Sequence, residues 1–158
     1  MRTAPYAAPG SLDRLLRGLR SHIRTRRLPR PDRLMIATGS RTAGVEFTTG
    51  TGRERLARLV VWSMTLHQVA HATVLILPNS QLLVQVTGRG PVGLTITLHT
   101  TCALTELGSR VRQAQHAWVG PHRLVVNTPD TVSIDELATV LTTTRTTVAA
   151  PPVLGLTA

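Results

Sequence analysis

Residues 72–99, ATVLILPNSQLLVQVTGRGPVGLTITLH, contain three apolar segments separated by the short turns PNS and GRG. Asn, Gly, Pro and Ser favour tight turns. In the last segment Val92, Leu94, Ile96 and Leu98 alternate with glycine or polar residues, which is the period of a strand with one buried face. We therefore predict a meander of three strands. Its first segment, 72–77, is continuously apolar, which is typical of a central strand and leaves a buried helical turn as the alternative.

Two further strands and a helix are predicted before the meander. RLMIAT (33–38) and GVEFTT (44–49) flank a turn-rich segment and read as paired strands. Thr51 and Glu54 have the spacing of a capping box, which predicts that a helix begins there and extends over 52–70. The apolar stripe of this helix comprises Leu56, Leu59, Val60, Ser63, Leu66 and Ala70.

After the meander we predict a helix over 102–115, a strand over 122–128 and a last helix over 134–145. Ser133 and Glu136 form a second capping box at the start of the last helix. The order is helix, two strands, helix, three strands, helix, then a strand–helix extension. Strands joined in sequence between helices favour the α+β class, here a mainly antiparallel sheet of about five to six strands with packed helices.

The N-terminal stretch SLDRLLRGLRSHIRTRRLPRP (11–31) predicts an amphipathic helix that Pro29 and Pro31 bring to an end. Its apolar residues recur at helical spacing, at Leu12, Leu15, Leu16, Leu19 and Ile23. We predict three parts: a basic N-terminal arm with this helix (1–33), a single α+β domain (34–145) and a mobile C-terminal tail (146–158).

All 18 basic residues are arginine, and the formal net charge is +10. The absence of lysine is typical of the codon usage of a high-GC genome, so the position of each arginine is more informative than their number. Residues 1–33 contain nine arginines and two acids, a net charge of +7 in one fifth of the chain. A basic block of this kind is typical of a surface that faces a polyanion. The predicted nucleic-acid-binding residues are Arg14, Arg17, Arg20, Arg24, Arg26, Arg27, Arg30 and Arg33.

Nucleic acid is the partner we favour, bound through its backbone and with weak sequence specificity. The chain has only four aromatic residues, and we find no helix-turn-helix or zinc finger that reads bases. Arg53, Arg55 and Arg58 could extend the basic surface. Two alternatives remain for the arm: a helix lying on an anionic membrane surface, or a core-facing helix that leaves only residues 24–33 exposed.

The order of elements from about 11 to 115 resembles that of the roadblock (dynein light chain) family. The pieces that carry the resemblance are LMIATGSRTAGVEFTT (34–49), the capped helix after it and the three-stranded meander. The strand and helix predicted after residue 120 depart from that layout, and other small α+β folds share it. The resemblance implies a dimerising interaction module that regulates a protein partner such as a small GTPase, with no catalytic residues.

Enzyme signatures are incomplete, so we favour a non-enzymatic protein without a cofactor and keep an enzyme or metal site as an alternative. His67 and His71 have metal-ligand spacing on the predicted helix, but Gln68 replaces the glutamate of a zinc-protease motif. His99 and Cys102 lie where a strand would lead into a helix, whose N-terminus can activate a thiol.

Cys102 is the only cysteine, which excludes an internal disulfide. No apolar stretch is long enough to span a bilayer, and Met1–Gly10 lacks the pattern of a secretory signal. These features predict a cytoplasmic protein. The acid-poor, arginine-rich first helix keeps a transit peptide as the alternative.

Overall fold

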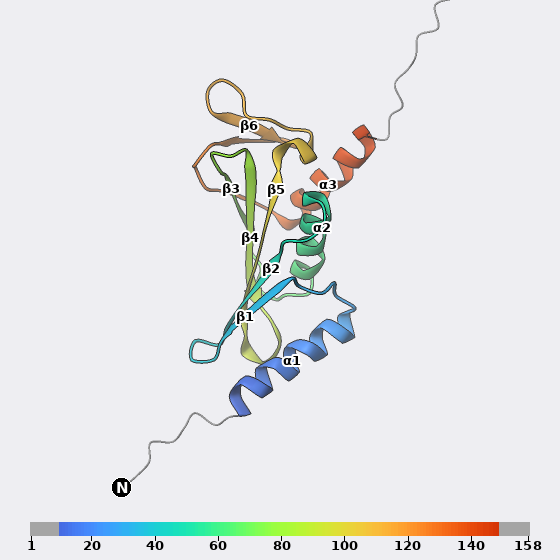
Figure 1. Cartoon of the computed structure of the whole chain (residues 1–158), viewed down its shortest axis with the longest axis vertical. Helices are drawn as coiled ribbons and strands as arrows, with labels where there is room; N and C mark the ends of the chain where they lie inside the picture. Colours follow the sequence, from blue (N-terminus) through green and yellow to red (C-terminus); the bar gives the residue numbers. More distant parts are fainter. Residues whose placement is uncertain (1–9, 149–158) are drawn as a thin grey trace, which may run out of the picture.

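The computed structural model describes residues 10–148 and has the predicted α+β fold (Figure 1). Within residues 10–148, six strands form one sheet in which only β2 and β5 run parallel. Their order across the sheet is β1 (Arg33–Ala37), β2 (Thr42–Phe47), β5 (Thr95–Ala103), β4 (Gln81–Arg89), β3 (Ala72–Ile76) and β8 (Asp130–Val132). The predicted meander corresponds to β3, β4 and β5.

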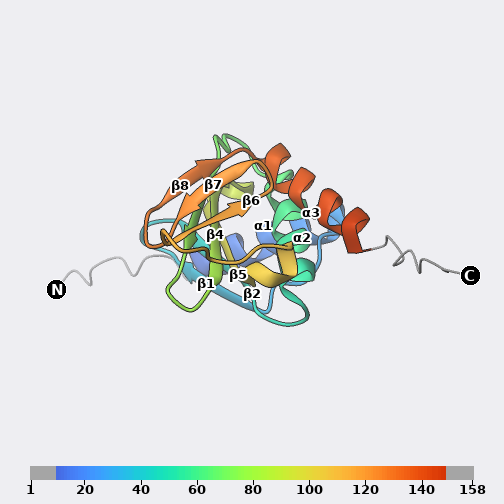
Figure 2. The same ribbon diagram turned by 90° about the horizontal axis from the view of Figure 1, so that it is seen from above.

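In the described part of the chain, two helices cover one face of this sheet and a third lies at one end of it (Figure 1). α2 (Gly52–Ser63) packs on β5, and α3 (Ile134–Val148) packs on α2, so both lie on one side of the sheet (Figures 1 and 2). α1 (Gly10–Arg26) crosses one end, and a separate hairpin of β6 (His116–Val119) and β7 (His122–Val125) lies at the opposite end (Figure 1). No helix in the described part of the chain is both long and apolar enough to cross a membrane.

The core lies between the sheet and the helices. Alternate residues of β2, β4 and β5 are buried against α2, as the strand period requires. Trp62 of α2 is fully buried and meets Phe47 of β2 edge to face, with ring centroids 6.2 Å apart. α1 contributes Leu15 and Leu19 to the same core, so it is docked on the rest of the fold.

Both predicted capping boxes are confirmed. The Thr51 hydroxyl accepts from the Glu54 amide at 3.2 Å, and the Glu54 carboxylate accepts from the Thr51 amide at 3.0 Å. Ser133 and Glu136 form the same pair of bonds, at 3.1 and 2.7 Å. Each box satisfies amide groups that a helix N-terminus leaves unpaired.

The predicted helix over 102–115 is wrong. β5 continues to Ala103, where it still pairs with β4, and only the 3₁₀ turn η2 (Leu104–Leu107) follows. Gly108 then adopts a left-handed conformation with φ of +68°, which ends the helical geometry after one turn. β6 and β8 were not predicted, and β7 covers only the first part of the predicted strand over 122–128.

Three helix and strand boundaries also differ from the prediction. The predicted helix over 52–70 ends at Ser63, because the hydroxyls of Ser63 and Thr65 donate to Val60 and Trp62 carbonyls and the chain turns away. The last strand of the meander, expected over 91–99, begins only at Thr95, because Pro91–Gly93 form the 3₁₀ turn η1 and Val92 is 39% exposed. α3 continues through Val148, into the segment expected to be a tail, whereas 149–158 lie outside the described residues.

Candidate nucleic-acid interface

α1 places its apolar and basic residues on opposite sides. Leu15 and Leu19 are buried, whereas Leu12 is 44% exposed and marks the edge of the packed face. Four arginines lie on the outward side: Arg14, Arg17, Arg20 and Arg24, here called the α1 arginine face. Their spacing of three or four residues follows the helical period, so they form a row about 15 Å long.

The row continues past these four residues with Arg26 at the end of α1, Arg27 and Arg30 in the connecting segment and Arg33 at the start of β1, all exposed. Arg27 has a φ of +51°, and the Leu28 amide donates to the Ile23 carbonyl at 2.9 Å, which turns the chain out of the helix. Arg33 lies 3.8 Å from the Glu46 carboxylate. Within residues 10–148, the side chains of the other seven predicted arginines have no ion pair.

Asp32, the acid closest to these arginines in sequence after the helix, is bound elsewhere. Its carboxylate accepts from the Thr48 amide (2.6 Å), the Thr49 amide (3.0 Å) and the Thr49 hydroxyl (2.7 Å). These hydrogen bonds, led by the Thr49 amide, lower the pKa of Asp32 to about 2, and the Arg58 charge adds to them. Asp32 therefore stays ionised without neutralising its arginine neighbours.

α1 packs on η1, and hydrogen bonds join α1 and the segment after it to the C-terminal end of α2 and the turn that follows it. The Trp62 indole N–H donates to the Pro29 carbonyl at 2.8 Å. The His22 Nε2 atom lies 3.0 Å from the Thr65 hydroxyl, and burial, followed by the Arg26 charge, lowers the pKa of His22. The arginine row is therefore carried by a fixed support, and Met1–Pro9 of the predicted arm lie outside the described residues.

The three arginines of α2 do not extend this surface. The Arg55 guanidinium donates to the Thr101 carbonyl (2.9 and 3.1 Å) and to the Gly50 carbonyl (2.6 Å). Arg58 donates to the Thr49 carbonyl and lies 3.4 Å from the Asp32 carboxylate. Arg53 donates to Leu141, so all three stabilise the fold.

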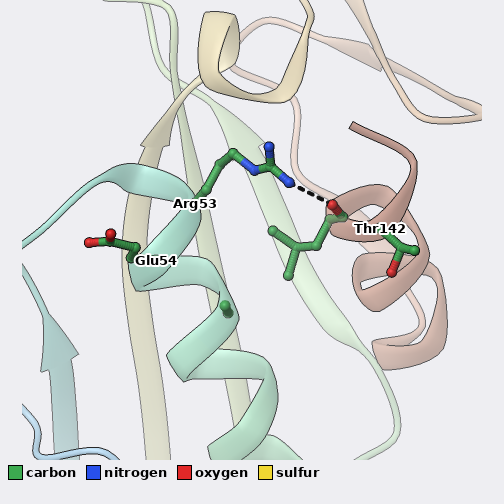
Figure 3. A pocket seen from close by; sticks show the side chains of 5 residues that line it. Arg53, Glu54 and Thr142 are labelled. Atoms are coloured by element: carbon green, nitrogen blue, oxygen red, sulfur yellow. Dashed lines mark hydrogen bonds between the residues drawn. The ribbon is translucent and has the colours of Figure 1, made fainter. Parts of the chain in front are cut away.

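A cavity of about 410 Å³ lies where Arg53 bridges α2 and α3 (Figure 3). Arg53 reaches across it to the Leu141 carbonyl at 2.7 Å, and Glu54 already belongs to the capping box of α2. Both charged groups of the cavity are thus engaged within the protein, which gives the cavity a structural role.

The alternative of a metal site at His67 and His71 depended on their lying on one helix, and the structure does not place them on one. Both follow the end of α2, so they do not share a helix face. His67 instead pairs with Arg89 of β4 through two backbone hydrogen bonds, and Gln68 has a φ of +57°. Among the described residues no group of three or more His, Cys, Asp or Glu side chains is placed to hold a metal ion.

The alternative enzyme site at His99 and Cys102 is not supported either. Both lie on β5, three residues apart, so their side chains point to opposite faces of the sheet. Cys102 is buried, and burial, with the Glu106 charge next, raises its pKa to about 12. A thiol with this pKa is not a nucleophile at neutral pH.

His99 has a different partner, which the sequence did not reveal. Its Nε2 atom lies 2.5 Å from the Glu46 carboxylate on the neighbouring parallel strand. Glu46 and His99 are 53 residues apart, and only the register of β2 against β5 brings them together. The pair lines a cavity of about 350 Å³, whose other charged residue, Arg55, is bound to backbone carbonyls.

No protein-family model, no curated protein and no solved structure matches the chain. The roadblock resemblance therefore stays a prediction from the order of elements.

Proposed function

We propose that the protein associates with nucleic acid through the α1 arginine face and the arginines that follow it. The observation that supports this proposal is the row of eight exposed arginines that runs from the docked helix α1 to the start of β1, of which only Arg33 has an ion pair among the described residues. Unpaired guanidinium groups bind phosphate oxygens bidentately and release condensed counterions.

This mode of binding is directed to the backbone. The apolar side of α1 is packed on the protein, so the helix offers a polyanion only its arginine face. That face carries no aromatic side chain to stack on a base. Phosphate contacts of this kind fix position without reading sequence, so duplexes of unrelated sequence are expected to bind with similar affinity.

The test is a titration of the full chain with fluorescent DNA duplexes of two unrelated sequences over a series of salt concentrations. Replacing Arg17 and Arg20 by Gln is expected to lower the affinity at low salt about tenfold or more and to reduce the slope of log K against log salt by about 2. The matched control is Arg41→Gln with Arg89→Gln, which removes the same charge from exposed residues outside the row. Salt-independent binding, or equal loss in both variants, overturns the proposal.

A dimerising interaction module is a second proposal, favoured by the open side of the sheet. β1 is an edge strand, and its Met35 is 49% exposed and pairs with Gly44, so it lies on the sheet face opposite to that of the buried Val45. An exposed edge can pair with a second copy. Sedimentation equilibrium is expected to give a dimer that Met35→Lys weakens, and a monomer at all concentrations rejects this candidate.

A further inference from the structure

The two tryptophans occupy contrasting environments. Trp62 is fully buried, with its indole N–H bound to the Pro29 carbonyl. Trp118, on β6, is 50% exposed, and no described residue accepts a hydrogen bond from its indole N–H. Because exposed aromatic surface is unfavourable in water, a half-exposed tryptophan on a small hairpin suggests a contact surface.

Trp118 forms one wall of a cavity of about 410 Å³ whose charged lining residues are both arginine. The lining residues are Thr105, Gly108, Ser109, Arg110, Arg112 and Trp118. Arg123 lies directly opposite Trp118 in the hairpin, so it adds a third guanidinium on the same face. Within residues 10–148, none of these three arginines has an ion pair.

The backbone around this cavity is held in place. The Ser109 amide donates to the Leu104 carbonyl at 2.9 Å, and the Arg112 amide donates to the His116 carbonyl at 2.8 Å. These bonds fasten the segment that carries Arg110 and Arg112 to η2 on one side and to β6 on the other. The tryptophan and the arginines are therefore presented together before any ligand arrives.

We propose that this cavity binds a nucleotide, with the base stacked on Trp118 and a phosphate held by Arg110 and Arg112. A base has an aromatic face that stacks on tryptophan, and its phosphate complements the arginines. The described lining residues include no carboxylate, which favours an anionic ligand. The site lies at the opposite end of the molecule from α1, so it does not depend on the α1 arginine face (Figure 1).

The intrinsic tryptophan fluorescence of the full chain measures this binding directly. Trp62 is fully buried, so quenching by an added base reports on Trp118. Thymidine monophosphate and a short oligodeoxythymidylate are titrated separately. Quenching by both with equal affinity supports a site for free nucleotides, and tighter binding of the oligomer supports a site for single strands.

Variants separate stacking from charge. Trp118→Ala, with binding followed by a label on the oligomer, is expected to lower the affinity about tenfold or more, and Trp118→Phe to retain part of it. Arg110→Gln with Arg112→Gln is expected to lower the affinity for the oligomer and to reduce the dependence of that affinity on salt concentration. Val125→Ala is the matched control, because Val125 is also exposed on the outer face of the hairpin but does not line the cavity.

The outcomes also separate this site from the α1 surface. Arg17→Gln with Arg20→Gln is expected to leave the fluorescence quenching unchanged, while the duplex titration reports on α1. Absence of quenching by either ligand, or an unchanged affinity in a folded Trp118→Ala variant, overturns the Trp118 site whatever the duplex result.

Discussion

α1 and α2 both carry arginines at helical spacing, but they use them in opposite ways. In α2 the Arg55 guanidinium donates to carbonyls of β5 and of the loop before the helix, and Arg58 approaches Asp32. In α1 the side chains of Arg17 and Arg20 point to solvent, with no partner among the described residues.

This difference shows why arginine content alone is a poor guide to function. A guanidinium group that already donates to carbonyl oxygens holds the fold together, and its donors are not available to a phosphate. A free guanidinium on a docked helix contributes little to the fold, and its donors are available. The comparison assigns the α2 arginines to stability and the α1 arginines to binding, and four predictions test that assignment.

The largest effect is expected from Leu19→Ala, which removes the buried contact between α1 and the core. Leu19 is 1% exposed, so the loss of its side chain leaves a cavity and is expected to lower the free energy of unfolding by about 2–5 kcal/mol. Urea denaturation measures this change. Leu12→Ala, at a residue 44% exposed on the same helix, is the control and is expected to cost much less. Equal losses in the two variants would show that α1 is not docked through Leu19.

Arg55→Ala is expected to have the next largest effect. The variant loses three hydrogen bonds from a charged donor to the Thr101 and Gly50 carbonyls. Bonds of this type stabilise by about 1.5–3 kcal/mol, and we expect a loss in that range in urea denaturation. Arg17→Ala is the matched control on α1 and is expected to change the stability by at most about 0.5 kcal/mol. A similar loss from both would remove the distinction between the helices.

The elements that could be predicted from the sequence are those whose local signals agree with their final environment. Thr51 and Ser133 begin helices because a capping box acts within four residues. The alternation at Leu94, Ile96 and Leu98 marks a buried strand face wherever the strand pairs. The helical spacing of Leu15 and Leu19 likewise predicted the apolar face of α1, which packs on the core.

The remaining features depend on contacts between distant residues. Leu104 and Leu107 have helical spacing, but pairing with β4 extends β5 to Ala103 and Gly108 ends the turn that follows. The Glu46–His99 pair requires the parallel register of β2 and β5, which no local pattern encodes. Trp118 meets Arg110 and Arg112 only because the unpredicted hairpin folds back on η2.

Asp32 lies between α1 and α2 in the sequence. Its substitution tests whether its carboxylate stabilises the fold. In the folded protein its pKa is about 2, below the ordinary 3.8, because the Thr48 and Thr49 groups donate to the carboxylate. A depressed pKa stabilises the fold above about pH 4 and loses that effect as the pH falls towards 2. Asp32→Asn is therefore expected to lower the stability at neutral pH, with the difference from the unaltered protein shrinking between pH 4 and pH 2.

Urea denaturation over that pH range measures the difference. Asp13→Asn is the control, because Asp13 is an exposed acid in the first turn of α1. If Asp32→Asn left the stability at neutral pH unchanged, the hydrogen bonds that Asp32 accepts from Thr48 and Thr49 would not stabilise the fold.

The smallest effects are expected from single changes in the α1 arginine face. Arg17→Gln and Arg20→Gln, taken one at a time, are each expected to reduce the slope of log K against log salt for duplex DNA by about 0.9, the effect of one phosphate contact. Because a phosphate carries no sequence information, the loss of affinity must be the same for duplexes of unrelated sequence. A loss confined to one sequence would mean that the arginine reads a base. The row on α1 would then have to enter a groove, where its packing on the core through Leu15 and Leu19 leaves only one side of the helix to make contact.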